Sequence, residues 1–586
     1  MRFRILLYLF TLSSALSFAQ ISVSASSYIY VDSVYIYADL PIRLEAADSH
    51  IYLRNKAQLI QGDTAGFNNS GLGSLSLYQA GNVNAYAFNF WCSPVGSTLE
   101  SAINNPYTTN LLGDPDSSTS TTEYVPASFT SNYNGTSNPL VIHGGWIFTY
   151  NSLAGASAAY NKVDESGPIS AGLGFTMKGT DGSANSQDYE FRGKPNTGTI
   201  SNAVAPGEFL LMGNPYPSGL DAYAFIHDSE NLNAIDGTLL FWEQDLNVLS
   251  HFTFDYVGAY AAYTIDVNGV ETFVPAPFRT YGAQNVGAPA GTGTKIATRY
   301  LDVGQGFFVT GKAGGSGIVK IKNSHRIYSN KADTPSLLFK NSNQQKALLS
   351  LHKRFSLNVD FDIVSRDAAS EEQFAYTVQL VHNFNDNATE GFDFGMEIRK
   401  QNSLESDVSW LQNNELFAAR ASVFSKDLII PIFLNSTEDV ALDFRLFDVQ
   451  NFESTDNIYL LDKETGTYYN LLFETASLSI ESGNYEDRFE IHFQNNSLSI
   501  EDEGINESGL FAFFDANNKE INISNKKVKI VNKVILFNVN GIKVISKSLK
   551  TAERTITIAT SNLSTGIYFL RCFTDNKIDD FKIVVR

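Results

Sequence analysis

Short runs of alternating apolar and polar residues recur along most of the chain. Between residues 20 and 84 such runs follow one another about eight residues apart, at positions 27–31, 34–37, 42–46, 51–54 and 58–61. Alternation with a period of two is typical of β-strands that bury one face. The pattern predicts either a meander or a few rungs of a parallel coil. Because the series is too short to form a solenoid alone, we expect residues 20–84 to be a β capping region of the next domain.

Two segments in the middle of the chain share four landmarks in the same order. Each has a proline turn, then an aromatic strand, an Ala-Ala-Tyr triplet and a G-x-G-F-x-x-x-G motif. The landmarks lie at 91–96, 146–150, 158–160 and 172–179, and again at 213–218, 239–243, 261–263 and 304–311. The shared order predicts a duplication, with one β unit at 85–205 and a second at 206–335. The second unit carries an insertion, rich in Gly, Ala, Pro and Thr, at 266–299.

A further β domain is predicted at residues 345–497. Residues 357–363, 442–447 and 489–493 alternate cleanly, and 459–469 has the pattern of a hairpin with a glycine turn. One buried face on each strand favours a β-sandwich. The polar stretch 498–519 is predicted to be a linker. Because no long segment has helical periodicity, the predicted fold class is all-β and multidomain, with a duplicated β-rich N-terminal region, a β-sandwich and a small Ig-like C-terminal domain.

The last segment, residues 520–586, is readable strand by strand. Strands are predicted at 534–539, 542–545, 555–558, 566–573 and 581–585, and Asn540-Gly541 supplies the positive φ angles of a tight hairpin turn. A valine-rich strand, an NG turn, the motif L-x-x-G-I-Y and a terminal basic strand follow in order. These features resemble the C-terminal sorting domain of type IX secretion cargo; the matching residues are Asn540, Gly541, Leu563, Gly566, Ile567, Tyr568, Lys582 and Arg586. The alternative is an ordinary Ig-like domain that ends a chain.

This resemblance implies a Gram-negative source, export through the periplasm, and recognition of the tail by the type IX secretion machinery. The motifs S-P-V-G at 93–96 and G-N-P-Y-P-S at 213–218 also resemble those of large exported surface proteins that carry the same tail. The implied destination is the outer cell surface or the medium.

The N-terminus has the pattern of a secretory signal peptide. Arg2 and Arg4 precede an apolar run, 5–16, that is too short to span a bilayer, and small residues follow it. We expect the signal to comprise residues 1–19, with cleavage between Ala19 and Gln20. No other segment is long and apolar enough to suggest a membrane span.

Charge is unevenly distributed. The formal net charge is −20, yet residues 521–586 carry twelve Lys and Arg against four Asp and Glu. The acidic body argues against nucleic acid or anionic lipid as partners. The basic tail is interpreted as a solvated face or a contact with a translocation component. The two cysteines, Cys92 and Cys572, are interpreted as small buried apolar residues rather than a disulfide.

The sequence contains no recognisable catalytic motif. The eight histidines lack metal-ligand spacing, G-x-S-x-G, H-E-x-x-H and Walker patterns are missing, and residues 287–295 fail the phosphate-loop spacing. We therefore predict no catalytic, cofactor or metal residues. The acidic turns at Asp114-Pro115-Asp116 and at 386–390 could ligate Ca²⁺ through loop oxygens, but we interpret them as solvated turns.

Aromatic residues offer a second kind of site. Tyr28, Tyr30, Tyr35 and Tyr37 are predicted to line one short sheet, and Trp146, Trp242 and Tyr150 to lie on equivalent strands of the repeats. Such rings either form core or bind sugars by stacking, and the core interpretation is preferred.

These features predict an exported, non-enzymatic, modular surface or secreted protein, an adhesin with surface glycans as candidate ligands. The alternative is a carbohydrate-binding protein or a polysaccharide-degrading enzyme whose carboxylate pair leaves no sequence signature.

Overall fold

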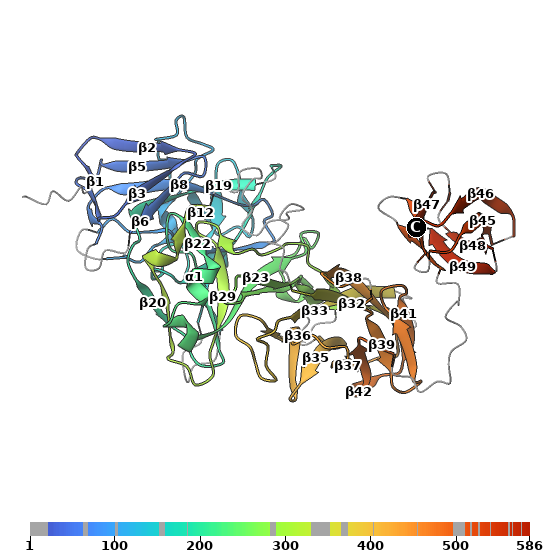
Figure 1. Ribbon diagram of the computed structural model, residues 1–586. Helices are drawn as coiled ribbons and strands as arrows, with labels where there is room; N and C mark the ends of the chain where they lie inside the picture. Colours follow the sequence, from blue (N-terminus) through green and yellow to red (C-terminus); the bar gives the residue numbers. More distant parts are fainter. Residues whose placement is uncertain are drawn as a thin grey trace, which may run out of the picture. The chain divides into compact units, whose positions relative to one another are not determined.

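The computed structural model is all-β and divides into two compact units, residues 1–494 and 495–586 (Figure 1). It describes residues 21–62, 68–99, 103–151, 159–184, 186–281, 289–329, 352–364, 373–401, 404–453, 455–495, 510–515, 519–525, 528–539, 541–560, 563–564, 566–575 and 577–585. The predicted signal peptide and the cleavage site at Ala19 and Gln20 lie outside these ranges. Among the described residues, helix is confined to short turns: α1 (Ala222–Ile226) and the 3₁₀ turns η1 (Thr109–Leu111), η2 (Gly144–Trp146), η3 (Asn231–Asn233), η4 (Thr253–Asp255) and η5 (Asn323–His325).

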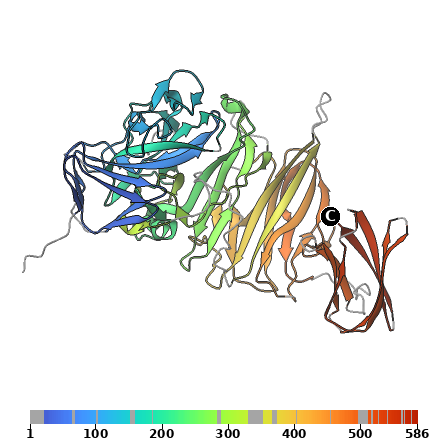
Figure 2. The same ribbon diagram turned by 90° about the horizontal axis from the view of Figure 1, so that it is seen from above.

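The first unit begins with a parallel coil. Its strands are β1 (Ile21–Val23), β2 (Tyr28–Asp32), β3 (Tyr35–Ala38), β4 (Ile42–Leu44), β5 (His50–Arg54), β6 (Gln58–Gln61), β7 (Ser70–Gly71) and β8 (Ser74–Asn82). Strands one rung apart pair in parallel, in the orders β1-β4-β7, β2-β5-β8 and β3-β6. The strands lie side by side in Figure 2 (dark blue). Parallel pairing decides between the two sequence-based alternatives in favour of the coil over the meander.

The coil buries its aliphatic side chains and exposes its tyrosines. Ile42, Ile51 and Leu59 point inward and are fully buried, whereas the rings of Tyr28, Tyr30, Tyr35 and Tyr37 are exposed. The core interpretation of these four tyrosines was therefore wrong. They also lie on two sheets rather than one, because β2 belongs to the sheet of β5 while β3 pairs with β6.

The third rung of the coil connects it to the following segment. Strand β8 pairs antiparallel with β19 over eight residue pairs, from Asn82 opposite Ser186 to Leu75 opposite Gly193. Further strands outside the coil and the two large sheets of the first unit are β10 (Val95–Gly96), β11 (Leu112–Gly113), β12 (Ser128–Thr130), β13 (Gly135–Thr136), β14 (Val141–His143), β18 (Thr180–Asp181), β19 (Ser186–Pro195), β20 (Ile200–Ala203), β22 (Gly219–Asp221), β28 (Tyr300–Leu301), β30 (Ile318–Ile321) and β31 (Arg326–Ile327).

An eleven-stranded central sheet follows, in the order β27-β26-β24-β23-β29-β21-β15-β17-β9, with β16 on β15 and β25 on β24. Its strands are β9 (Phe88–Cys92), β15 (Phe148–Asn151), β16 (Ala159–Lys162), β17 (Gly174–Lys178), β21 (Phe209–Gly213), β23 (Ile235–Gln244), β24 (Val257–Ile265), β25 (Glu271–Val274), β26 (Pro277–Thr280), β27 (Pro289–Thr292) and β29 (Gly306–Gly311). Three of them, β25 to β27, come from the predicted insertion and extend one end of the sheet.

The two G-x-G-F strands, β17 and β29, have matching neighbours and matching registers. Strand β17 pairs with β9 and β15, as β29 pairs with β21 and β23. Gly174 lies opposite Cys92, and Gly306 lies opposite Gly213. This arrangement is what a duplication would produce. The boundaries at 85–205 and 206–335 remain predictions.

The matching segments also contact each other reciprocally. The Cys92 N–H donates to the Gly304 carbonyl at 2.8 Å, and the equivalent Gly213 N–H donates to the Gly172 carbonyl at 3.3 Å. Gly172 and Gly304 both have positive φ angles, +82° and +72°, which side chains with a Cβ rarely adopt. The two segments also meet at Tyr160 and Tyr260, whose hydroxyl oxygens lie 3.0 Å apart.

The register corrects two of the sequence landmarks. Tyr150 lies opposite Tyr160 and Trp242 lies opposite Tyr260, so the equivalent of Tyr160 is Tyr260 and not Tyr263. Trp146 is not equivalent to Trp242 in the two segments, because Trp146 lies in η2, before β15 begins at Phe148.

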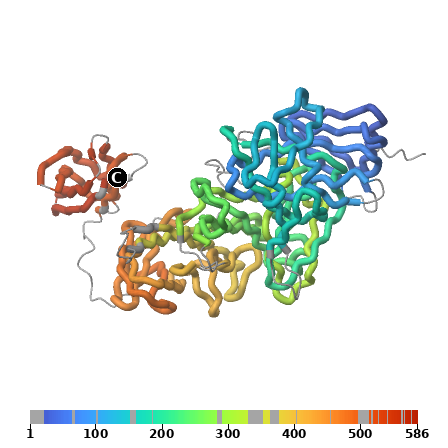
Figure 3. The backbone as a smooth tube through the Cα atoms, turned by 180° about the vertical axis from the view of Figure 1, so that it is seen from behind, coloured from blue at the N-terminus to red at the C-terminus, as the bar shows by residue number. Residues whose placement is uncertain are grey.

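The predicted β-sandwich is one continuous eleven-stranded sheet, curled around a single core. Its strands are β32 (Arg354–Val364), β33 (Gln373–Phe384), β34 (Ile398–Arg399), β35 (Asp407–Gln412), β36 (Glu415–Ser422), β37 (Ile429–Ser436), β38 (Val440–Gln450), β39 (Tyr459–Asp462), β40 (Thr467–Asn470), β41 (Ala476–Ile480) and β42 (Gly483–His492). All four sequence-predicted segments fall on these strands. A shared buried cluster joins the curled sheet to the central sheet, with Leu240 and Phe308 packed against Val381 and Ala419. Figure 3 shows the backbone of the central sheet (green) beside that of the curled sheet (yellow to orange).

The second unit contains two small sheets around one core. Its strands are β43 (Leu510–Asp515), β44 (Glu520–Asn525), β45 (Val531–Asn538), β46 (Lys543–Thr551), β47 (Thr555–Ala559), β48 (Gly566–Thr574) and β49 (Ile578–Val585). Each of the five predicted strands of the tail is present. Strands β43 and β44 were not predicted; β43 lies in the expected linker 498–519 and pairs with β44.

Candidate functional site

Aromatic side chains from four separate segments gather around one lysine at the β9 end of the central sheet. We define the Lys178 cluster as Tyr86, Phe88, Tyr133, His143, Trp146, Lys178, His251 and Tyr256. Lys178 ends β17 directly opposite Phe88 of β9. Trp146 ends the η2 turn, Tyr133 lies between β12 and β13, and His251 lies in the loop between β23 and β24. The fold thus assembles the cluster from residues far apart in sequence.

The lysine itself is buried beneath the rings. Only 4% of Lys178 is exposed, and its Nζ lies 3.9 Å from the ring centroid of Trp146, 5.0 Å from that of Phe88 and 5.1 Å from that of Tyr256. Within the described part of the chain no carboxylate pairs with it. Burial lowers the pKa of the Lys178 ammonium to about 7. Contact with the ring faces compensates part of this lost hydration.

Hydrogen bonds fix the orientation of His251 and Trp146. The His251 Nε2 lies 2.6 Å from the Asn134 Oδ1, which can only accept, so Nε2 carries the proton. The Nδ1 of His251 then accepts from the Lys178 Nζ at 2.9 Å. Burial, with Lys178 and His143 nearby, lowers the pKa of His251 to about 4, so its ring is neutral at pH 7. The Trp146 ring stacks on His251 and donates from Nε1 to the Tyr133 carbonyl at 2.9 Å.

Exposed apolar side chains belong to the cluster and to the loop that carries His251 and Tyr256. The ring of Tyr133 is 65% exposed, and loop 245–256 adds Phe252 at 65% and Phe254 at 56%. Leu246 and Leu249 of the same loop are also exposed, and the rings of Phe252 and Phe254 stack with centroids 5.4 Å apart. Exposed rings held in place by a packed layer beneath them are typical of contact surfaces.

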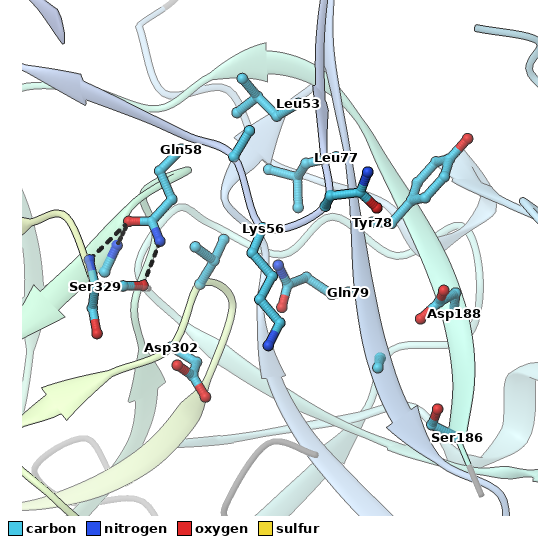
Figure 4. A pocket seen from close by; sticks show the side chains of 15 residues that line it. Leu53, Lys56, Gln58, Leu77, Tyr78, Gln79, Ser186, Asp188, Asp302 and Ser329 are labelled. Carbon is cyan, nitrogen blue, oxygen red and sulfur yellow. Dashed lines mark hydrogen bonds between the residues drawn. The ribbon is translucent and has the colours of Figure 1, made fainter. Parts of the chain in front are cut away.

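A cavity lies between the coil and the strands that follow it. It has a volume of about 280 Å³ and lies beside β5, β8 and β19. Figure 4 shows Lys56 extending into it, with Asp302 on one side and Asp188 on the other. Leu53, Leu77 and Val303 supply its apolar lining.

The predicted sorting residues divide into buried and exposed groups. Tyr568 is buried and its hydroxyl donates to the Ser564 carbonyl at 2.8 Å, which fixes the turn before β48. Leu563 packs against the core, Gly566 begins β48, and Gly541 has a φ of +72° at its hairpin. Ile567 is exposed, as is the neighbouring Phe569, which lies opposite Lys582 on β49. Asn540 and Arg586 lie outside the described residues.

The two acidic turns, interpreted from the sequence as solvated, use their oxygens within the fold, and Asp114 is buried rather than solvated. Asp114 accepts from the backbone N–H groups of Ser117 and Leu140, and Asp116 accepts from Gln187. In the second turn, Glu390 accepts from the Gln412 amide. Among the described residues, no group of three or more His, Cys, Asp or Glu side chains could hold a metal ion.

Two further sequence interpretations can be compared with the structure. Cys92 and Cys572 are both buried free thiols, as predicted. In the described ranges, no helix has the length and hydropathy needed to cross a membrane.

Sequence reasoning missed the Lys178 cluster. Its one local signal is the lysine at the end of an otherwise apolar strand, 174–178, whose residues are all buried. The residues of the cluster come from segments up to 170 positions apart, from Tyr86 to Tyr256, so no short motif contains them.

Comparison with known proteins identifies two regions of the chain. Residues 19–493 match a family model described as a domain of unknown function (DUF8693), and residues 517–586 match the secretion system C-terminal sorting domain. A search of curated proteins found no match.

Solved structures offer only weak likenesses. The BSP domain of a biofilm-associated protein is 11% identical, covers 87% of this chain and 95% of its own, and has a TM-score of 0.14. Tp47, a 47-kilodalton lipoprotein of Treponema pallidum, is 8% identical, covers 66% of this chain and 90% of its own, and has a TM-score of 0.12. Scores this low support no argument about fold or function. The two family matches do: the chain belongs to the DUF8693 family, and its tail marks it as a type IX secretion cargo protein that is exported to the cell surface or secreted.

Proposed function

We propose that the mature chain is a non-enzymatic adhesin that contacts glycans through the exposed face of the Lys178 cluster and loop 245–256. The observation that carries the proposal is the exposure of Tyr133, Phe252 and Phe254, each more than half accessible on an exported protein. Large exposed rings of this kind lose hydration when a partner covers them, which favours association.

Glycans suit this face better than lipids or nucleic acids. The C–H faces of sugar rings stack on aromatic rings, and sugar hydroxyls pair with neighbouring polar atoms, here the imidazole of His143 and the hydroxyl of Tyr133. Asp245 and Asp255 in loop 245–256 add negative charge, which disfavours anionic lipid and phosphate backbones. Anchoring of Trp146 from below reduces the ordering cost of binding.

A glycan array probed with the mature chain tests the proposal. We expect binding to one group of related glycans, and loss of most of that signal in the double variant Tyr133→Ala, Phe252→Ala. The matched control is Phe447→Ala, which removes an equally exposed ring, 65%, from strand β38 of the curled sheet. An array without signal, or equal signals from the double variant and the wild type, would contradict the proposal.

A further inference from the structure

The described residues that line the cavity in Figure 4 include two carboxylates and one ammonium group. Within the described part of the chain, the carboxylates of Asp188 and Asp302 have no hydrogen-bond or ion-pair partner, and both line the cavity. Burial raises the pKa of Asp188, and the nearby carboxylate of Asp116 raises it further. Lys56 supplies a single ammonium. Asp188 and Asp302 are half-buried and Lys56 is exposed, so the two carboxylates favour a cationic ligand over an anionic one.

The cavity is built from rigid parts. Asn55 and Lys56 both have left-handed backbone angles, φ +48° and +66°, in the turn that directs Lys56 into the cavity. Gln58 joins three segments, because its Oε1 accepts from the Gly219 N–H at 2.9 Å and its Nε2 donates to the Ser329 carbonyl at 2.7 Å (Figure 4). A site whose walls are already fixed loses little entropy when a ligand enters.

The lining combines polar and apolar surfaces. Leu53, Leu77 and Val303 are almost fully buried and form apolar wall, while Gln79 adds an amide beside the two carboxylates. Carboxylate and amide oxygens accept from hydroxyl groups, and apolar wall suits the C–H face of a ring. A volume of about 280 Å³ is large enough for one hexose but too small for a polymer segment of several sugars.

We propose that this cavity binds a single hexose-sized sugar, and that it prefers a sugar with a protonated amine to one with a carboxylate. The site goes beyond the aromatic contact face and does not depend on it, because the two share no residue. Asp302 belongs to the second G-x-G-F turn, and the equivalent position of the first turn is Ser170, so the fold provides this carboxylate only once.

Calorimetric titration of the mature full-length chain at pH 7 and low ionic strength tests the proposal with D-glucosamine, D-glucose, D-glucuronate and ethanolamine. We expect glucosamine to bind at least about tenfold more tightly than glucuronate, because one cation–carboxylate contact near a protein surface is worth that much. Glucose should lie between them. Ethanolamine, which carries the amine without the ring, should bind more weakly than glucosamine.

Near-isosteric variants assign the effect to the cavity. Asp188→Asn and Asp302→Asn should each lower the preference for glucosamine over glucuronate by at least about threefold. Asp386→Asn removes a carboxylate from an exposed turn outside the cavity and should leave the preference unchanged. Lack of binding by every sugar, equal affinity for glucosamine and glucuronate, or unchanged preference in both variants would overturn the proposal. If the variant Tyr133→Ala, Phe252→Ala keeps its binding on the glycan array, the aromatic contact face is refuted but the cavity proposal is not. The two proposals can therefore be refuted independently.

Discussion

Replacing Lys178 with methionine should remove a pH dependence of stability that the wild-type chain shows above pH 7. Burial lowers the pKa of this lysine from an unfolded value of 10.5 to about 7. Between those two values the unfolded chain binds one more proton than the folded chain, so stability rises with pH by about 1.4 kcal/mol per unit. From pH 8 to pH 10 the gain attributable to this lysine is about 3 kcal/mol. Methionine keeps the apolar stem and cannot titrate.

Urea unfolding followed by tryptophan fluorescence measures the difference between wild type and variant at each pH. We expect Lys178→Met to exceed the wild type by about 3 kcal/mol at pH 8 and by less than about 1 kcal/mol at pH 10. Lys162→Met is the control, because that lysine is exposed on β16 and pairs with Asp164 at 2.9 Å; its difference from wild type should not change with pH. Parallel pH profiles of wild type and Lys178→Met would show that the lysine is not held in a dehydrated cage.

Three further predictions concern export, the paired glycine strands and catalysis. Deleting residues 495–586 should leave a folded first unit that stays in the periplasm, since the two units are separately compact; equal extracellular amounts in cell fractionation would refute the sorting role. Gly306→Ala and Gly174→Ala should each cost about 2–4 kcal/mol in urea unfolding, because an added Cβ would lie 2.8 Å from the backbone of Phe90 and of Met212 respectively. Gly391→Ala, whose Cβ would lie 3.6 Å from its nearest neighbour, should change little. Finally, the mature chain should hydrolyse no common polysaccharide, and turnover lost in Asp188→Asn or Asp302→Asn would favour the enzyme alternative.

Local signals were enough to predict five of the seven strands of the second unit and five of the eleven strands of the curled sheet. Alternation with a period of two and glycine turns, such as Gly466 and Gly541 with φ near +70°, depend on neighbouring residues alone. Which distant strands pair with each other does not depend on neighbouring residues, so the sequence pattern could not predict the pairing. The coil shows this, since its alternating runs fit a meander as well as parallel rungs. The wrong core interpretation of the coil tyrosines has the same cause, because strand pairing decides which face of each strand points outward.

Repetition misled the alignment of the two central segments. Strand β24 contains Gly-Ala-Tyr at 258–260 and Ala-Ala-Tyr at 261–263, so the triplet could be matched at either place. The strand register matches the first triplet, 258–260, because Trp242 lies opposite Tyr260. The Lys178 cluster could not be predicted from the sequence. Its rings belong to separate loops and strand ends, and no spacing in the sequence marks them as neighbours.

Hydroxyl-radical footprinting read by mass spectrometry tests the contact face most directly. The mature chain is oxidised with and without the glycan that the array selects, and oxidation is quantified at each aromatic residue. We expect that glycan to protect Tyr133, Phe252 and Phe254, while Phe447 and Tyr28, which are also exposed, are oxidised equally in both samples. Bound glycan that leaves the first three unprotected, or that protects Tyr28 instead, would contradict the account.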